Sequence, residues 1–403
     1  MWGLAARSTY SLRLLRKTDL QLIYAASLLM MMGSSLIYPI LPVIHESLRI
    51  PKEQIGLVLS AFALPAVFMA PLAGFIADLR GRKWVMVGGL FLYGLAGFGI
   101  TVTNDFTWLL VLRTVQGVGY SGVMPLVVVL IGDTYTREQE TTAQGMKVFI
   151  DRIGMLCFPA VAGLLGAVAW QIPFLLYGLA VPVALCVLRW LPEPDITRHT
   201  RPMPYFKDVI AVARQLRCLV IFSISSLRFF LEYAFFTYLP IFALYALGVT
   251  VAKGGFLFTI YAVGAMVTAS QVGTLVLRWE RVNLVILAFF VQAVCLLATP
   301  PAQGFWWLGG VMLVFGLANG VISPTHKSLL TQSAPGQLRG GVVSADRVIQ
   351  NISKTVSPPI AGLVFGLSNV QGVFLVLAAV ALVWVLSVLV LQMQGRLQIA
   401  QSQ

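Results

Sequence analysis

Residues 74 to 83 read Gly74-Phe75-Ile76-Ala77-Asp78-Leu79-Arg80-Gly81-Arg82-Lys83, a charged, glycine-bearing stretch between two long apolar runs. The flanking runs, 54–77 and 84–103, are too long and too apolar for ordinary core helices, because about 20 apolar residues suffice to cross a bilayer. The stretch is therefore predicted to be a tight turn at a membrane surface. Gly81 permits a turn that a bulkier residue would strain, and Arg82 and Lys83 hold the turn at the cytoplasmic face.

The composition of the chain agrees with a membrane protein. Of the 403 residues, 58% are hydrophobic and 11% are charged, and the mean hydropathy is +0.86. Most of the chain must therefore face lipid or pack inside a membrane bundle. The net charge of +13 does not indicate a nucleic-acid partner, since the Lys and Arg residues are scattered through short connectors. The expected partners are the lipid bilayer and a small-molecule substrate.

The cysteines and histidines do not predict a metal site. The four cysteines lie in or beside apolar runs, without metal-ligand spacing, and are expected to be small buried hydrophobic residues and not disulfide partners. His45, His199 and His326 are far apart in the sequence. We therefore expect neither a metal nor another cofactor.

The apolar runs divide the chain into twelve predicted spans, so both termini lie on one side of the membrane. The spans lie near 20–43, 54–77, 84–103, 107–131, 142–167, 171–190, 218–245, 254–277, 282–299, 304–329, 341–366 and 370–391. The connectors on the side of the termini hold Arg80, Arg82, Lys83, Arg137, Arg189, Arg198, Arg201, Lys207, Arg214, Arg217, Arg278, Arg281, Lys327 and Arg339. Those on the other side hold only Arg49, Lys52 and Lys253. The positive-inside rule therefore places both termini in the cytoplasm.

An internal repeat relates the two halves of the chain. A long cytoplasmic connector at 191–217 separates a predicted six-helix bundle at 1–190 from a second one at 218–403. A shift of 199 residues superposes Gly56 on Gly255, Gly74 on Gly273, Arg82 on Arg281, Gly117 on Gly316, Pro125 on Pro324, Pro159 on Pro358 and Gly163 on Gly362. Two parallel repeats with a site between them are expected of a secondary transporter that rocks one half against the other.

Three motifs resemble those of the major facilitator superfamily, and within it the drug:proton antiporter group of twelve spans. The opening stretch is similar to the family's loop signature, with Ile76 and Leu79 as departures. The fourth span contains the signature residues Leu109, Arg113, Gln116, Gly117 and Gly119. The fifth span contains the antiporter residues Gly145, Gly154, Pro159 and Gly163, while Phe158 and Ala162 replace two glycines of that signature. The resemblance implies an all-α membrane fold with twelve helices in two pseudo-symmetric bundles.

The resemblance also implies a conformational latch at the opening stretch. Its residues are Gly74, Asp78, Gly81, Arg82, Lys83 and Asp133. Asp78 would lie against the positive N-terminal end of the eleventh span, near Gly340 and Gly341, and Arg82 would reach Asp133. In the second half Leu277 stands where the first half has Asp78, so the latch is expected to be asymmetric. The alternative is that Asp78 is only a solvated loop charge.

Ionisable residues inside spans are candidates for proton coupling, because their burial in a membrane is costly. Lys147 and Asp151 are one helical turn apart, as are Arg228 and Glu232, so each pair shares a helix face and could simply be neutralised. Arg113 has no carboxylate one turn away. We therefore expect Arg113 to pair with Asp151 for proton coupling, with Glu232 as the second candidate carrier.

The charge balance of the spans predicts the type of substrate. Six cations stand against three carboxylates within the spans, and the first span has no acid beyond Asp19 at its start. This favours a neutral, zwitterionic or anionic lipophilic substrate. The predicted substrate cavity contains Tyr38, Gln116, Arg228, Tyr233, Phe236, Asn319, Arg347, Asn351 and Lys354. Packing of the aromatic residues and of the polar stripe on the eleventh span is the alternative.

Together these features predict a monomeric transporter, and not an enzyme, in the cytoplasmic membrane of a bacterium. By alternating access it would export a drug-like, siderophore-like or lipid-like molecule, with the proton gradient as its energy source. Import of a small metabolite by proton symport is the first alternative, which the two departures Phe158 and Ala162 keep open. A membrane receptor without transport activity is a remote one.

Overall fold

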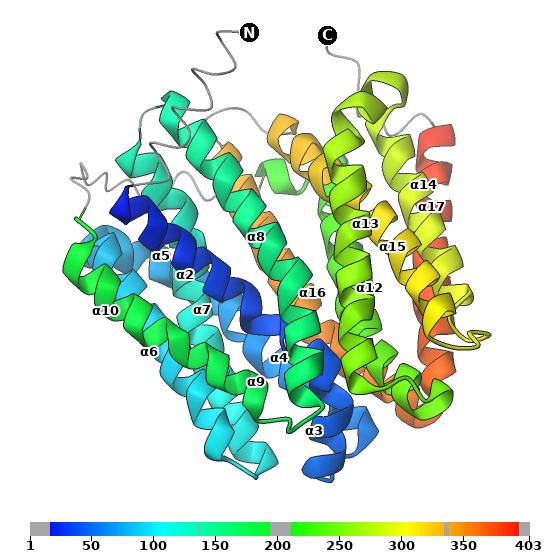
Figure 1. Cartoon of the computed structure of the whole chain (residues 1–403). Helices are drawn as coiled ribbons and strands as arrows, with labels where there is room; N and C mark the ends of the chain where they lie inside the picture. The colour runs from blue at the N-terminus through cyan, green and yellow to red at the C-terminus, as the bar shows by residue number, and fades with distance from the viewer. Residues whose placement is uncertain (1–16, 136, 194–210, 334–337, 395–403) are drawn as a thin grey trace, which may run out of the picture.

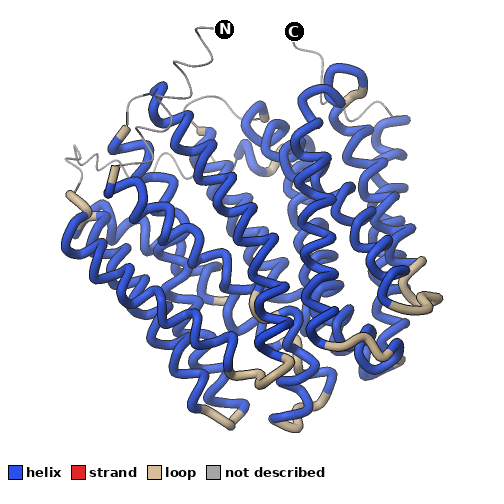
Figure 2. Tube along the Cα trace, viewed as in Figure 1, coloured by secondary structure: helices blue, strands red, loops and turns tan. Residues whose placement is uncertain are grey.

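The computed structural model describes residues 17–135, 137–193, 211–333 and 338–394, and these are helical apart from short turns (Figures 1 and 2). The first half contains α2 (Thr18–Ser35), η1 (Tyr38–Ile40), α3 (Leu41–Ser47), η2 (Lys52–Gln54), α4 (Leu57–Ala63), α5 (Pro65–Arg80), α6 (Arg82–Gly99), η3 (Ile100–Val102), α7 (Phe106–Thr134), α8 (Arg137–Gly166), α9 (Ile172–Leu175), η4 (Leu176–Leu179) and α10 (Ala180–Trp190). The second half contains α12 (Leu216–Leu247), α13 (Val251–Arg278), α14 (Arg281–Leu297), α15 (Phe305–Gln332), α16 (Arg339–Leu367) and α17 (Val370–Met393).

Each of the twelve predicted spans corresponds to a helix or to a series of short helices. In the described part of the chain, ten segments are long and apolar enough to cross a membrane. The other two spans are α14, which has 17 residues, and α16, which has 29 residues but a polar first half. All-helical structure follows from the environment, because a membrane interior offers no water to satisfy exposed backbone groups.

Prolines account for two interrupted spans. The first span ends its regular helix at Ser35 and continues as η1 and α3, which carry Pro39 and Pro42 in their first turns. The second span changes from α4 to α5 at Pro65. Proline lacks the backbone N–H and fixes φ, so it is tolerated at the start of a helix and breaks one elsewhere.

The helices extend beyond the apolar runs, which corrects the assignment of some connector residues. The helix α8, which forms the fifth span, begins at Arg137, five residues before the predicted start of that span. Lys327, expected in a connector, lies inside α15, which continues to Gln332. Polar residues can extend a helix out of the membrane because its backbone is already hydrogen-bonded internally, so hydropathy alone does not mark its end.

Figure 1 shows the two halves side by side, with α8 and α16 close to the boundary between them. The helix α8 packs on α13, and α4 packs on α16. We call the end at which α2 begins and α17 ends the termini face, and the opposite end, where α3 lies, the far face (Figure 1).

Close glycine contacts join the halves on the side of the far face. A Cβ on Gly163 would lie 2.9 Å from the Val251 carbonyl oxygen, and one on Gly56 would lie 2.8 Å from the Pro358 carbonyl oxygen. The backbone of Gly255 touches that of Pro159 in the same way. The repeat offset of 199 residues turns the pair Gly56 and Pro358 into the pair Gly255 and Pro159. The contacts between the halves therefore follow the internal symmetry.

Polar contacts also join the two halves, from the far face to the middle of the membrane-spanning region. Tyr245 Oη donates to Glu46 Oε1 at 2.8 Å near the far face. Closer to the middle, Ser60 Oγ donates to the Thr355 carbonyl oxygen at 2.6 Å. The structure is therefore closed on the far face.

Candidate functional site

The buried guanidinium of Arg113 organises the first half. Arg113 lies on α7 and is 0% exposed. Its Nη2 donates to the Gly33 carbonyl oxygen at 2.9 Å, and its Nε donates to the Val58 carbonyl oxygen at 3.3 Å. Its Nη1 donates to Gln116 Oε1 at 2.7 Å, and its Cζ lies 4.3 Å from the centre of the Phe62 ring. One side chain thus joins α2, α4 and α7.

The end of α2 explains why backbone oxygens bind this arginine. The last four carbonyls of a helix lack partners within it, and α2 ends at Ser35. The Gly33 carbonyl oxygen accepts a hydrogen bond from Arg113, and the Met32 carbonyl oxygen accepts one from Tyr177 Oη at 2.9 Å. Side chains of α7 and η4 therefore satisfy the end of α2 inside the membrane.

The expected pairing of Arg113 with Asp151 is wrong for this structure. Asp151 Oδ2 lies 2.7 Å from Lys147 Nζ, and its Oδ1 accepts from Ser27 Oγ at 2.6 Å. A cation one turn away on the same helix requires no helix movement to reach the carboxylate, whereas Arg113 is occupied by carbonyl oxygens. Gln116, predicted to line the substrate cavity, is also 0% exposed and bound to Arg113.

A second polar cluster lies on α12 and α15, in the second half. Arg228 Nη2 lies 3.7 Å from Glu232 Oε2, and its Nε donates to Asn319 Oδ1 at 2.7 Å. Asn319 Nδ2 in turn lies 3.0 Å from Glu232 Oε2 and 2.5 Å from Tyr261 Oη. The expected pairing within α12 is present, and Asn319 extends it to a neighbouring helix.

Two cations share one aromatic ring beside this cluster. Lys354 Nζ lies 4.3 Å from the centre of the Phe229 ring, and Arg228 Cζ lies 4.7 Å from it. Lys354 Nζ is also 6.0 Å from the centre of the Tyr233 ring. Among the residues that the structure describes, no carboxylate lies within ion-pair distance of Lys354. Lys354 is therefore held by the faces of aromatic rings. We call Arg228, Phe229 and Lys354 the cation shelf.

Tyr38 and Phe236, predicted to line the cavity, are buried in a packed aromatic cluster instead. Their ring centres lie 5.2 Å apart, and Tyr38 stacks on Phe258 at 5.5 Å. Phe236 also meets Tyr261 at 4.8 Å. This cluster joins η1 of the first half to α12 and α13 of the second, so the packing alternative describes Tyr38 and Phe236 in this structure. Tyr233 lies beside them and shares a hydrogen bond of 3.2 Å with Ser34.

The polar stripe on α16 divides into residues with different contacts. Asn351 Nδ2 donates to the Ala66 carbonyl oxygen of α5 at 3.2 Å, which is a contact between the halves. Arg347, one turn earlier, is exposed. The stripe therefore contributes both to packing and to the accessible surface, and it does not pack as a unit on Asn319.

The latch stretch contains the expected ion pair between Arg82 and Asp133. The expected contact of Asp78 with Gly340 and Gly341 lies outside the described side chains. Gly81 has a φ of +105°, a left-handed conformation that side chains strain. Leu277, the counterpart of Asp78, is 86% exposed.

Glu193 adds a contact to the latch that the sequence did not suggest. Its Oε1 accepts from the backbone N–H of Arg82 at 2.6 Å, and its Oε2 accepts from that of Lys83 at 3.1 Å. A carboxylate here satisfies free N–H groups at the start of α6 and meets the positive end of its dipole. The beginning of the long connector is thus attached to the latch stretch.

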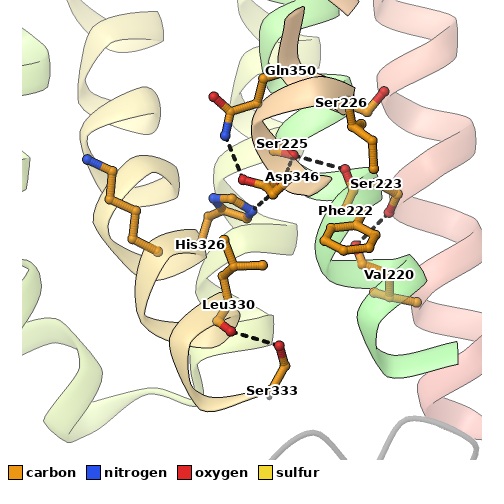
Figure 3. A network of polar contacts seen from close by, with 12 residues as sticks. Val220, Phe222, Ser223, Ser225, Ser226, His326, Leu330, Ser333, Asp346 and Gln350 are labelled. Atoms are coloured by element: carbon orange, nitrogen blue, oxygen red, sulfur yellow. Dashed lines mark hydrogen bonds and ion pairs between the residues drawn. The ribbon is translucent and has the colours of Figure 1, made fainter. Parts of the chain in front are cut away.

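A buried cluster on α12, α15 and α16 was also missed (Figure 3). Asp346 Oδ1 accepts from Ser225 Oγ at 2.5 Å, and its Oδ2 accepts from Gln350 Nε2 at 2.6 Å. His326 Nε2 lies 3.3 Å from Asp346 Oδ1. Asp346 is 1% exposed and His326 3%. Asp346 is one of the three carboxylates within the predicted spans, but the nineteen residues between it and His326 leave no local spacing that would indicate the pair.

The family of the chain is shown by its match to a family model. Two overlapping ranges, 23–353 and 221–398, match the model described as Major Facilitator Superfamily. The chain belongs to this superfamily. Its members are transporters and not enzymes, and this one is an integral membrane protein.

Relatives of this superfamily member include exporters. The bacillibactin exporter of Bacillus subtilis (strain 168) is 23% identical over 381 residues, which cover 87% of this chain and 90% of that one. The quinolone resistance protein NorA of Staphylococcus aureus (strain MRSA252) is 30% identical over 156 residues, covering 39% of this chain and 40% of NorA.

Solved structures of other transporters share the fold. A mutant of the nucleoside transporter NupG superposes with a TM-score of 0.80 and 16% identity, covering 93% of this chain and 99% of that one. The human organic anion transporter MFSD10 (TETRAN) superposes with a TM-score of 0.66 and 18% identity, covering 92% and 98%. At these identities the likeness concerns the fold alone.

Proposed function

We propose that this superfamily member exports lipophilic small molecules across the cytoplasmic membrane of a bacterium, driven by the inward flow of protons. The observation that carries this proposal is the position of the antiporter-motif glycine Gly163, where α8 meets α13 at backbone contact. A motif that sits on the boundary between rocking halves acts on the conformational change itself. The exporters among the relatives support the direction of transport. In this proposal both termini lie in the cytoplasm.

The substrate we propose is a neutral, zwitterionic or anionic lipophile. The cation shelf supports this, since Arg228 and Lys354 share one ring while Glu232 is the one carboxylate within ion-pair distance of either in the described residues. Arg347 adds an exposed positive charge on α16. An interior surface with excess positive charge attracts an anionic or polar group and repels a lipophilic cation.

Asp151 and Glu232 are the proposed proton carriers. Each lies beside a cation and a hydrogen-bond donor from another helix, Ser27 for Asp151 and Asn319 for Glu232. A rocking movement that separates such a carboxylate from its partners changes its proton affinity between the two states. In this scheme Arg113 positions α2, α4 and α7 and carries no proton.

Transport assays in inverted membrane vesicles test the direction and the coupling. With an acidic vesicle interior, we expect uptake of the lipophilic anion anilinonaphthalene sulfonate to exceed that of the lipophilic cation ethidium, and to stop when a protonophore removes the pH gradient.

Two variants test the residues in the same vesicles. Asp151→Asn should remove gradient-driven uptake but leave exchange down a concentration gradient, whereas Lys354→Gln should lower anion uptake selectively. Gradient-driven uptake in right-side-out vesicles instead would establish import by symport, and no gradient-dependent flux in either orientation would refute the proposal.

The asymmetric latch is tested by matched substitutions in the two halves. Asp78→Asn is expected to lower the transport rate severalfold while the protein still inserts, because only the ion pair of Arg82 and Asp133 and the Glu193 contact would then remain in the latch. Leu277→Ala, at the repeat-related and exposed position, should leave the rate within about twofold of wild type. Flux and membrane-inserted protein are measured for both, and equal losses would eliminate the asymmetry.

A further inference from the structure

The cluster of Asp346 and His326 differs in its charge from the other intramembrane carboxylates. Asp151 and Glu232 lie beside the permanent cations of Lys147 and Arg228. A proton added to either carboxylate leaves a cation in a largely buried site without its counter-charge, which is costly. Asp346 instead has as its partner an imidazole, which is charged only when it is protonated. A proton added to ionised Asp346 and neutral His326 takes the pair from one negative charge to none.

Ser225 lets the cluster satisfy its hydrogen bonds in both protonation states. Its Oγ lies 2.5 Å from Asp346 Oδ1 and 3.1 Å from the Phe222 carbonyl oxygen. When Asp346 is ionised, the hydroxyl donates to the carboxylate. When Asp346 is protonated, the carboxyl donates to Ser225 Oγ, and the hydroxyl turns to the carbonyl oxygen. The change needs only a hydroxyl rotation and no helix movement.

His326 offers a second position for the same proton. Its Nε2 is buried, and it makes no hydrogen bond among the residues that the structure describes. With the proton on Nε2, the imidazolium faces Asp346 Oδ1 at 3.3 Å. The pair therefore has two arrangements for one added proton, and both leave no net charge.

Other ionisable groups lie on the helices around the cluster. They are Arg217, Cys218, Arg228, Glu232, Tyr233, Tyr238 and Tyr245 on α12, Lys327 on α15, Arg339, Arg347 and Lys354 on α16, Asp78 and Arg80 on α5, Lys52 and Glu53 on η2, Lys253, Tyr261 and Arg278 on α13, Arg281 and Cys295 on α14, His45 and Glu46 on α3, and Tyr38 on η1. The helices α4 and α17, which also pack on α16, carry none. Lys354 of the cation shelf lies on the same helix as Asp346, α16, eight residues further along the chain.

We infer that Asp346 and His326 form a proton-binding site of the second half, in which Ser225 adjusts the hydrogen bonds to the bound proton. The site joins α12, α15 and α16. A part in energy coupling rests on the proposed proton-driven export. Proton binding by the cluster does not depend on that proposal, because it requires no transport.

Infrared difference spectroscopy of the full-length protein in lipid bilayers tests this site without a substrate. As the pH falls, the wild type should gain the C=O absorption of a buried protonated carboxyl group, and Asp346→Asn should lose that component. His326→Gln should keep it but move its midpoint, since the second position for the proton, on the imidazole, is then lost. Ser225→Ala should change its frequency through the lost hydrogen bond.

Glu232→Gln is the matched control, because it removes another buried carboxylate and should leave the Asp346 component unchanged. An Asp346→Asn spectrum identical to that of the wild type, in the carboxyl C=O region and in the bands of the imidazole ring, would overturn the site. If that variant does not fold, the site would be overturned by a C=O absorption whose midpoint is unchanged in His326→Gln and whose frequency is unchanged in Ser225→Ala. Absence of proton-driven flux would refute the proposed export and leave this spectroscopic result intact, so the two failures are distinguishable.

Discussion

Replacement of Arg113 by methionine should abolish transport and destabilise the first half. The side chain donates to the Gly33 and Val58 carbonyl oxygens and to Gln116 Oε1, all within the membrane. Methionine fills much of the volume but provides no donor for these acceptors. Hydrogen bonds between membrane helices average ~0.6 kcal/mol and reach ~1.7 kcal/mol, so the loss of the two bonds to α2 and α4 should cost about 1–3 kcal/mol. The thermal unfolding temperature of the protein in detergent measures this loss, and vesicle uptake measures transport.

Arg113→Lys separates the charge from the geometry. Lysine keeps the positive charge but lacks the planar fork that reaches acceptors on α2, α4 and α7 together. We expect Arg113→Lys to lose most of the stability and activity that Arg113→Met loses. Arg278→Met, at an exposed arginine in the last turn of α13, is the control and should behave as wild type. Wild-type transport by Arg113→Met would contradict the organising role of this residue.

Alanine at Gly163 or Gly255 should disturb the closed far face, although only one methyl group is added. A Cβ on Gly163 would lie 2.9 Å from the Val251 carbonyl oxygen and 3.0 Å from Gly255 Cα, and backbone atoms cannot rotate away. The helices α8 and α13 must then separate. Overpacking of this kind costs about 1–3 kcal/mol, which is enough to shift the balance between the two conformations of a transporter about tenfold. We expect a corresponding loss of transport.

The same helices provide matched controls for this prediction. A Cβ on Gly145 of α8, or on Gly254 of α13, would meet no described atom within 4 Å. Alanine at these positions should leave transport unchanged, because alanine also favours the helix. In a cysteine-free background, a cysteine at the buried Ser60 reports the opening of the far face to an impermeant maleimide. Faster labelling is expected with Gly163→Ala and not with Gly145→Ala, and equal labelling would disprove this account of the contact.

Contacts within one helix could be predicted for the candidate site, whereas most contacts between helices could not. The pairs Lys147 with Asp151 and Arg228 with Glu232 follow from a spacing of four residues, which the helix itself brings together. The partners of Arg113 depend on the depth at which α2 ends and on the rotation of α4. Neither quantity is encoded in the sequence of α7. Asp151 was therefore the expected partner of Arg113, whereas its actual partners between helices are carbonyl oxygens.

The contacts of Glu193 and His326 could not be predicted from the sequence for the same reason. Glu193 opens a long connector and meets the start of α6 more than a hundred residues away, so no local spacing indicates it. His326 stands on α15 and meets Asp346 on α16 only because those helices pack with these faces together. A motif can report such an encounter when the family uses it, as with Arg82 and Asp133. Without a motif, the pairing has no sequence signal.

Hydropathy and residue spacing were sufficient for the membrane class, the twelve spans, the repeat of 199 residues and the pairs within helices. These properties depend on the cost of placing backbone and charge in lipid and on the pitch of a single helix, which act on neighbouring residues. The closed far face, the carbonyl cage of Arg113, the cation shelf and the Asp346 cluster depended on tertiary structure. Each is set by the depth, rotation and crossing of separate helices, which only their mutual packing determines.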